Sequence, residues 1–466
     1  MPSAYARMAV CGASAGRVIY PSMADPTLLR PRWADTWVCT PQLAATDHLP
    51  PAPFTTAGRA FQDCTLRQTV RVTAGGEAVR VRFSNAYGRA PLRLAAGTVA
   101  VPAGGRSGAS AIAPGSTRPL RFAGAPGVLV PPGGEVESDA VAMPVPSGSR
   151  LSLTVHLTGG LAADEVTSHP GSRTTSYVCA GDRVGAPDLL GAARVDHWYF
   201  LSGVQVLASA PVATAVLIGD SLTDGRGTTT NGDDRWFDLL FDRLYADPDA
   251  DPVAVLSHAA GGTALLDDDP GGRLVQQALT RTGLRWVLVF KGVNDLGTAA
   301  ATKAAQDRVA GELLAAYDRI VAGLAPHGVR VYGATLPPFG GNAGYDDPAG
   351  HRQAARQRVN AWVRTSGRFD QVVDFDQAVR DPRDPRRLAA EFDCGDHLHL
   401  TPAGYRALAD AVPLDWFRSA ATVSPWPGPP ARPRSLPEGH GRRAGRGRRT
   451  GGGPGRAGST GRRSPQ

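Results

Sequence analysis

The sequence predicts an α/β domain with a parallel sheet, preceded by an N-terminal β-sandwich. In the first half, apolar and polar residues alternate in short runs between Gly and Pro, and helical spacing is absent. From about Val212, short apolar runs alternate with stretches of helical spacing, which is typical of parallel strands joined by crossover helices. Composition agrees with this, because 56 Gly and 39 Pro among 466 residues require many turns.

A chain of this length can bury two cores. We expect a loose leader over 1–32, a β-sandwich domain over 33–207, an α/β domain over 208–420 and a disordered basic tail over 421–466. The tail holds ten Arg and one Glu, so it accounts for the net charge of +8. The charge therefore gives no reason to expect a nucleic-acid site on the folded part. We expect the tail to be solvated without a dedicated partner, although such a tail can contact RNA or anionic surfaces.

In the first half, two runs of period two flank Gly75 and Gly76. Val70 and Val72 precede the glycines, and Val79 to Phe83 follows them, which predicts a hairpin with one buried face. We expect similar strands around 92–101 and 151–157. The polar residues of the hairpin region favour a solvated outer face, with a sugar-binding face as the alternative: Arg71, Arg80, Arg82, Asn85 and Tyr87.

In the second half, the elements follow one another as strand and helix. The expected strands are 215–219, 253–256, 287–290, 329–334 and 371–374. A first helix is expected over Arg235–Tyr245, and a closing helix over Pro402–Ala411. A further helical stripe is formed by Leu313, Tyr317, Ile320 and Leu324, which we expect to pack in the core.

The apolar run from Ala215 to Ile218 ends in Gly219-Asp220-Ser221. This turn follows a strand, and open α/β sheets place their chemistry at the carboxyl ends of their strands. Ser221 is therefore a candidate nucleophile. Taken alone, a serine in such a turn is more often a helix N-cap, so the interpretation needs a base, an acid and oxyanion donors.

Asp396 and His399, spaced i and i+3 before the closing helix, are candidates for the acid and the base. His397 is the rival base, but in an extended loop it points elsewhere. Asp396, His397 and His399 could alternatively bind a metal, but no fourth ligand stands at a recognisable spacing. We expect neither a metal nor a cofactor. His258 either lines the pocket or is structural.

Two glycine-containing turns follow the neighbouring strands and are expected at the same edge of the sheet as Ser221. One is Gly261-Gly262, and the other is Gly292-Val293-Asn294-Asp295. Together with the serine and histidine blocks they give four blocks in a fixed order. That order is far more specific than any single block.

These blocks resemble the four signature blocks of the SGNH/GDSL hydrolases over roughly 212–417. The strings GDSLTDGRGTTTNGDDRW, FKGVNDLG, GATLPPF and GDHLHLTPAGY are most similar to the branch that includes rumen-bacterial xylanase-associated arylesterases and acetyl xylan esterase-like proteins. The segment TLRQTVRVTAGGEAVRVRFSNAYGRAPLRL is similar to the region that precedes the hydrolase domain in that branch. The resemblance implies a flavodoxin-like, three-layer hydrolase domain.

The resemblance also implies the roles of the site residues. Ser221 would be the nucleophile, His399 the base and Asp396 its partner. The backbone N–H groups of Ser221 and Gly262 and the side-chain amide of Asn294 would form the oxyanion hole. This sequence departs from the family pattern in two places. Leu400-Thr401 follows the histidine where a proline and a small polar residue are usual, and Lys291 places a cation near the oxyanion side.

The predicted function is a serine carboxylester hydrolase that removes acetyl or other short acyl groups, with carbohydrate esters suggested by the resemblance alone. Two alternatives stay open: a general lipase or arylesterase acting on small lipophilic esters, and a catalytically idle glycan-binding protein. The expected partner is a small-molecule or carbohydrate ester. We expect no membrane association, because no apolar run approaches the roughly 18 residues of a membrane span.

The five cysteines, at positions 11, 39, 64, 179 and 394, show no metal-ligand spacing and are expected to be mostly buried thiols. A disulfide among Cys39, Cys64 and Cys179 is the alternative for a secreted protein. Residues 8–15 are too short and polar for a convincing secretory core. The sequence as written predicts a cytoplasmic protein, and the resemblance predicts export if the start site is misassigned.

Overall fold

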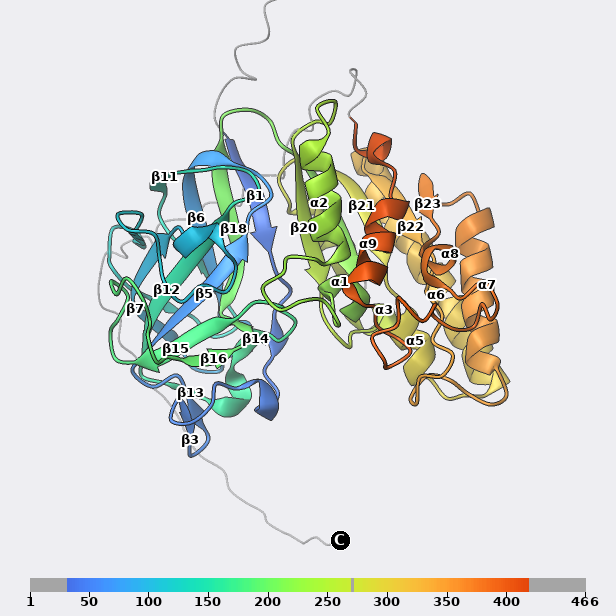
Figure 1. The fold of residues 1–466 in the computed structure, drawn as a ribbon, viewed down its shortest axis with the longest axis horizontal. Coiled ribbons are helices and arrows are strands. Elements are labelled where there is room, and N and C mark those ends of the chain that lie inside the picture. Colours follow the sequence, from blue (N-terminus) through green and yellow to red (C-terminus); the bar gives the residue numbers. More distant parts are fainter. Residues whose placement is uncertain (1–31, 270–271, 419–466) are drawn as a thin grey trace, which may run out of the picture. The chain divides into compact units, whose positions relative to one another are not determined.

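The computed structural model describes residues 32–269 and 272–418 (Figure 1). Residues 1–31 of the leader expected over 1–32, and the basic tail expected over 421–466, lie outside the described residues, and so does Cys11. All the described residues belong to one compact unit. The domain boundaries given above stay predictions.

Two antiparallel sheets make up most of the N-terminal part (Figure 1). The first has the order β1-β18-β6-β10, with β11 beside β6: β1 Arg32–Val38, β18 Leu201–Ala208, β6 Gly76–Ser84, β10 Glu135–Glu137 and β11 Val141–Val145. The second has the order β16-β15-β5-β12-β7-β8, with β9 beside β7: β16 Ala193–Val195, β15 Ser176–Ala180, β5 Cys64–Arg71, β12 Arg150–Thr158, β7 Leu92–Ala100, β8 Arg118–Pro119 and β9 Val128–Val130.

Two smaller sheets complete this strand-rich region. They are β17-β14-β2 and β13-β4-β3: β17 Trp198–Tyr199, β14 Thr167–His169, β2 Gln42–Leu43, β13 Leu161–Ala162, β4 Arg59–Ala60 and β3 Thr55–Thr56. Alternate apolar residues of the two large sheets, such as Leu66 and Val70 of β5 and Val79 and Val81 of β6, share one buried core. The prediction that the N-terminal part is built of strands is confirmed.

The predicted hairpin at Gly75-Gly76 is wrong. β5 pairs with β12 and β15, whereas β6 pairs with β18, β10 and β11, so the two strands lie in different sheets. The segment that links β5 to β6 is held by β1, because Thr36 exchanges hydrogen bonds with Thr73 and Ala74. Period-two alternation predicts which residues face a core, but it does not identify the partner strand.

Three residues of the expected solvated face are taken up by internal contacts instead. Arg71 is buried and forms an ion pair with Asp242 of the C-terminal part. Arg82 pairs with the buried Asp35, and Asn85 donates through Nδ2 to the carbonyl of Ala90 at 2.9 Å. These three side chains are therefore not available as a solvated or sugar-binding surface.

The C-terminal part contains a five-stranded sheet in which every strand pair is parallel. Its order is β20-β19-β21-β22-β23, with β20 Val253–Ala259, β19 Ala213–Gly219, β21 Leu284–Phe290, β22 Arg330–Ala334 and β23 Gln371–Val373. In chain order this is 2-1-3-4-5, the order of flavodoxin-like doubly wound sheets. The predicted parallel sheet is confirmed.

Helices cover both faces of this sheet (Figure 1). Ala215 and Leu217 of β19 pack on the side of α2 Trp236–Ala246, α8 Phe375–Val379 and α9 Pro402–Ala411. Val216 and Ile218 pack on the side of α3 Leu265–Asp268, α4 Arg273–Leu279, α6 Lys303–Leu324 and α7 His351–Thr365. Burial on both faces explains why β19 is apolar along its length. Two short helices, α1 Ser221–Asp224 and α5 Val293–Thr298, begin at strand ends.

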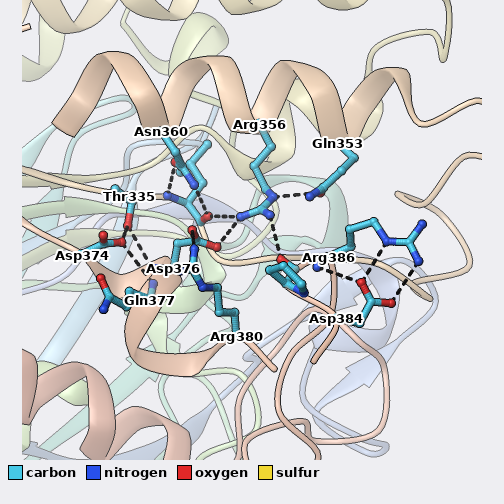
Figure 2. Close-up of polar contacts among 12 residues, drawn as sticks. Thr335, Gln353, Arg356, Asn360, Asp374, Asp376, Gln377, Arg380, Asp384 and Arg386 are labelled. Atoms are coloured by element: carbon cyan, nitrogen blue, oxygen red, sulfur yellow. Dashed lines mark hydrogen bonds and ion pairs between the residues drawn. The ribbon is translucent and has the colours of Figure 1, made fainter. Parts of the chain in front are cut away.

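A buried polar network joins α7 and α8 to the segment that follows β22 (Figure 2). Arg356 contacts Asp376 at 2.5 Å and donates to the carbonyl of Leu336 at 2.9 Å. Asn360 bonds both the N–H and the carbonyl of Leu336, at 2.7 and 2.8 Å. The network fixes the start of the loop that leads to Tyr345, a residue that reaches the candidate site.

The four described cysteines, Cys39, Cys64, Cys179 and Cys394, are free thiols, so the alternative of a disulfide among the first three is not realised. Within the ranges 32–269 and 272–418, no helix has the length and apolar character needed to cross a membrane.

Candidate active site at the carboxyl edge of the parallel sheet

Ser221 lies where β19 ends and α1 begins. Asp220 is the N-cap of this short helix, and its Oδ1 accepts the N–H of Leu222 at 3.0 Å. The turn is tight, because a Cβ on Gly219 would lie 2.3 Å from the Thr223 hydroxyl oxygen. The alternative role for Ser221 was that of helix N-cap, and Asp220 has that role instead. The Ser221 side chain is therefore free for another contact.

The structure brings His399 and Asp396 to this serine. Ser221 Oγ lies 2.7 Å from His399 Nε2, although the two residues are 178 positions apart. His399 Nδ1 lies 2.6 Å from Asp396 Oδ2. The other carboxylate oxygen, Asp396 Oδ1, accepts the backbone N–H groups of Leu398 and His399 at 3.0 and 2.8 Å. The carboxylate is thus held in one orientation by the loop that it belongs to.

The electrostatics of the pair follow from these contacts. Partial burial raises the pKa of Asp396, but the hydrogen bonds from the backbone and ring of His399 outweigh this and bring it down to about 2. Burial lowers the pKa of His399, and Asp396 opposes that shift. With Asp396 ionised, Nδ1 of His399 carries a proton, so a neutral ring presents Nε2 to Ser221 as an acceptor.

The rival base His397 and the other candidate histidine, His258, have other partners. His397 Nδ1 lies 2.5 Å from Asp393 Oδ2, and its side chain is 44% exposed. His258 is buried and accepts a hydrogen bond from Arg281 Nε at 3.0 Å, so of its two predicted roles the structure shows the structural one. In the described part of the chain, no three His, Cys, Asp or Glu residues converge as a metal-binding group.

The two glycine-containing turns lie at the same sheet edge. A Cβ on Gly261 would lie 4.0 Å from the Ser221 Cβ, so this turn borders the serine directly. Gly262 has φ +75°, a left-handed conformation that suits glycine. Asn294 is buried at the start of α5 and donates through Nδ2 to the carbonyl of Thr263 at 2.8 Å. The second N–H of this amide remains for another acceptor.

Sequence reasoning missed Tyr345. Its hydroxyl donates to Asn294 Oδ1 at 2.7 Å, so the oxygen of the amide is held by the tyrosine and the nitrogen by Thr263. These two contacts determine which way the Asn294 amide points. No pattern in the sequence indicates this, because Tyr345 lies in an irregular loop 51 positions away.

Lys291, expected to place a cation near the oxyanion side, contacts the end of β19 and the residue that follows the Gly261-Gly262 turn. Its Nζ donates to the Gly219 carbonyl at 3.0 Å, contacts the Thr263 hydroxyl, and lies 3.0 Å from the carboxylate of Asp268. The ammonium is therefore buried and paired, and it ties the end of β19 to the residue after Gly262. Burial raises the pKa of Asp220 to about 6, and the charge of Lys291 opposes that shift.

The Leu400-Thr401 departure leaves the closing helix intact. Thr401 Oγ1 accepts the N–H of Gly404 at 3.2 Å as the N-cap of α9, and Pro402 occupies the first helical position. Leu400 is fully buried in the core under the site.

Among known families, a model of the GDSL-like Lipase/Acylhydrolase family fits residues 217–407. This range spans Ser221, both glycine-containing turns and the Asp396-His399 loop. Comparison with curated proteins gives no match.

Several solved structures are similar to part of the chain. A lipase/acylhydrolase from Enterococcus faecalis is 20% identical, covers 43% of this chain and 92% of its own, and has a TM-score of 0.31. A GDSL-like lipase from Bacteroides thetaiotaomicron is 15% identical, with 42% and 84% covered and a TM-score of 0.31. A member of the lipolytic protein G-D-S-L family from Veillonella parvula is 15% identical, with 43% and 95% covered and a TM-score of 0.30.

Proposed function

We propose that this chain, whose residues 217–407 match the GDSL-like lipases and acylhydrolases, is a serine carboxylester hydrolase with Ser221, His399 and Asp396 as its triad. The observation that carries the proposal is the 2.7 Å contact between Ser221 Oγ and His399 Nε2, with Asp396 on the far side of the ring. A nucleophile, its base and the group that orients the base form the arrangement needed for acyl transfer.

The proposed reaction runs in two halves. His399 Nε2 takes the proton of Ser221 as Oγ bonds to the ester carbonyl carbon, and the carbonyl oxygen becomes an oxyanion. When the intermediate collapses, the bond to the alcohol breaks, and Nε2 returns the proton to the departing alcohol. Water then attacks the acyl-enzyme by the same route, releasing the acid and the free serine. Asp396 stabilises the imidazolium in both halves.

We propose the backbone N–H groups of Ser221 and Gly262 and the Nδ2 of Asn294 as the oxyanion donors. Replacing Asn294 with Ala is expected to lower kcat by about 10²-fold to 10³-fold, the usual effect of losing one such donor. KM should change little, because the bound ester has no oxyanion, and the charge develops only on the way to the tetrahedral intermediate. Steady-state kinetics on p-nitrophenyl acetate would check this. Tyr345→Phe, which frees the Asn294 oxygen but keeps the amide, should show a smaller loss of the same kind.

The acidic side of the pH profile is expected to be set by His399. Its protonated form cannot accept the serine proton, so kcat/KM should rise with pH through the pKa of this ring. Burial lowers that pKa from its ordinary value of 6.5. The pH at which kcat/KM reaches half its maximum should therefore lie below 6.5. Asp396 has a pKa of about 2 and stays ionised throughout. A midpoint above 6.5 in the p-nitrophenyl acetate profile would contradict this assignment.

For the substrate we propose acetyl or other short acyl esters of carbohydrates. Two observations support this: the similarity of the signature strings to the xylanase-associated branch, and a charged, exposed side chain beside the triad. Arg226 lies 3.9 Å from Asp396 and is 63% exposed, which suits a polar alcohol. Acetate release from acetylated xylan, compared with hydrolysis of p-nitrophenyl esters of increasing acyl length, would separate this from a general lipase or arylesterase.

A fluorophosphonate probe would test the reaction class. The probe forms a covalent bond only with an activated serine, so mass spectrometry should find it on the peptide that contains Ser221, and labelling should abolish ester hydrolysis. Labelling of a different serine, or no ester hydrolysis by the unlabelled protein, would refute the proposal and leave the glycan-binding alternative.

A further inference from the structure

Two side chains hydrogen-bond the backbone of Gly261, the residue before the proposed donor Gly262, and each connects it to the strand-rich region. One connection is direct: Gln42 of β2, in the strand-rich region, donates through Nε2 to the Gly261 carbonyl at 3.1 Å. The other runs through Asp224, the last residue of α1, whose Oδ2 accepts the Gly261 N–H at 3.2 Å. Both backbone groups of Gly261 are therefore held by side chains.

Asp224 is itself held by the strand-rich region. His169 of β14 places Nε2 2.8 Å from Asp224 Oδ1, and the two side chains are only 4% and 3% exposed. His169 Nδ1 lies 2.8 Å from the carbonyl of Thr40. A carbonyl oxygen can only accept, so Nδ1 carries a proton and the ring orientation is fixed. The ring also stacks on Trp198, with centroids 5.7 Å apart.

The close approach of the two segments depends on a glycine. Gly171 follows His169 by two residues, and a Cβ at this position would lie 1.7 Å from Asp224 Oδ2. Any larger residue would push β14 away from α1. His169 therefore binds the Asp224 carboxylate, and Gly171 leaves the space that the carboxylate needs.

We propose that the strand-rich region is a working part of the active site: Gln42 and His169, the latter through Asp224, are positioning residues that hold the Gly261-Gly262 turn for oxyanion binding. The inference rests on the proposed function. Gly262 has a left-handed φ of +75°, and its N–H belongs to the peptide that Gly261 begins. Fixing the N–H and the carbonyl of Gly261 fixes the direction of the Gly262 N–H. Donors that are already oriented cost no reorganisation during the reaction.

The test uses the full chain with p-nitrophenyl acetate as substrate and phenylboronic acid as a mimic of the tetrahedral intermediate. His169→Phe keeps a ring beside Trp198 but loses both hydrogen bonds. It is expected to lower kcat by about tenfold to 100-fold, the scale of loss when reacting groups are misplaced. Its KM should stay within about twofold, and its affinity for the boronic acid should fall in parallel with kcat.

Asp224→Ala should behave like His169→Phe. Asp224→Asn keeps an oxygen that accepts the Gly261 N–H, and its NH₂ can face His169 Nε2, so this variant should recover most of the loss. Gln42→Ala, at a partly exposed position, supplies a second route if His169→Phe does not fold, with a smaller loss of the same kind. The matched control is His156→Phe. His156 of β12 also lies 2.8 Å from a carboxylate, that of Asp63, but Asp63 is 75% exposed and the contact lies within the strand-rich region.

The outcomes separate the inference from the proposed function. If Ser221→Ala is inactive while Asp224→Ala and Gln42→Ala keep wild-type kcat and boronic acid affinity, the positioning role is refuted and the esterase stands. If His156→Phe loses kcat as His169→Phe does, or if the losses follow the melting temperature alone, the effect is general destabilisation and the inference fails. If the wild type hydrolyses no ester, the proposed function fails first.

Discussion

Replacing Ser221 with Ala is expected to lower kcat for p-nitrophenyl acetate by about 10⁵-fold to 10⁶-fold, because serine, histidine and aspartate act as one unit. The substitution removes the nucleophile and one hydrogen bond to His399. A typical hydrogen bond contributes about 1 kcal/mol to stability, so the melting temperature should change little. Steady-state kinetics and thermal unfolding of the same preparation would check both points.

Two histidine variants make this prediction sharper. His399→Gln should lose as much as Ser221→Ala, and the double variant should lose no more than either, since the two residues serve one step. His397→Gln is the matched control, because that ring bonds Asp393 and not the serine. Activity that survives in Ser221→Ala, or an equal loss in His397→Gln, would contradict the triad assignment.

Several residues near Ser221 could be predicted because the carboxyl ends of parallel strands lie at the same edge of a sheet. Once an apolar run is identified as a parallel strand, the polar residues that follow it must lie at one sheet edge. This places Ser221, Gly262 and Asn294 near one another without any knowledge of the strand order. The closing helix starts at Pro402, as predicted, but the place of the preceding Asp396-His399 loop beside Ser221 was indicated by the resemblance to the SGNH/GDSL hydrolases.

Pairings between distant side chains could not be predicted in this way. The alternation around Gly75 indicated two strands, but the partner of each strand depends on residues far along the chain, and the predicted hairpin was wrong. Arg71 has the sequence neighbourhood of a solvated position, yet it is buried against Asp242 because β5 borders the C-terminal part. Tyr345 and His169 contact the site from a loop and from a short strand, and neither segment carries a periodic signal.

Because contacts between distant side chains could not be predicted, the sequence indicated no role for the strand-rich region. Its resemblance to the segment ahead of other hydrolase domains indicated that the two parts occur together, but it did not indicate why. The contacts of Gln42 and His169 supply one, because they hold the turn beside the nucleophile. Under this proposal, the chemistry of the α/β part depends on side chains of the strand-rich region, and one of them, Gln42, lies 219 positions before the Gly261 that it holds.

Asp396→Asn is expected to lower kcat by about 10⁴-fold while leaving the fold and the position of His399 unchanged. The reason lies in the loop geometry. Asp396 Oδ1 accepts two backbone N–H groups, from Leu398 and His399, so an asparagine at this position must keep its oxygen there. Its NH₂ then faces His399 Nδ1, which can only be an acceptor. The ring is left with its proton on Nε2, pointing at Ser221, and cannot take the serine proton.

Asp396→Asn is also expected to change the pKa of His399. The carboxylate no longer supports the imidazolium, so the pKa of His399 should fall further below 6.5 than in the wild type, where Asp396 opposes the effect of burial. The ring proton signals of His399 in an NMR titration would measure this directly. If Asp396→Asn retained wild-type kcat, Asp396 would not orient the base, and the second carboxylate of the loop, Asp393, would have to be tested in the same way.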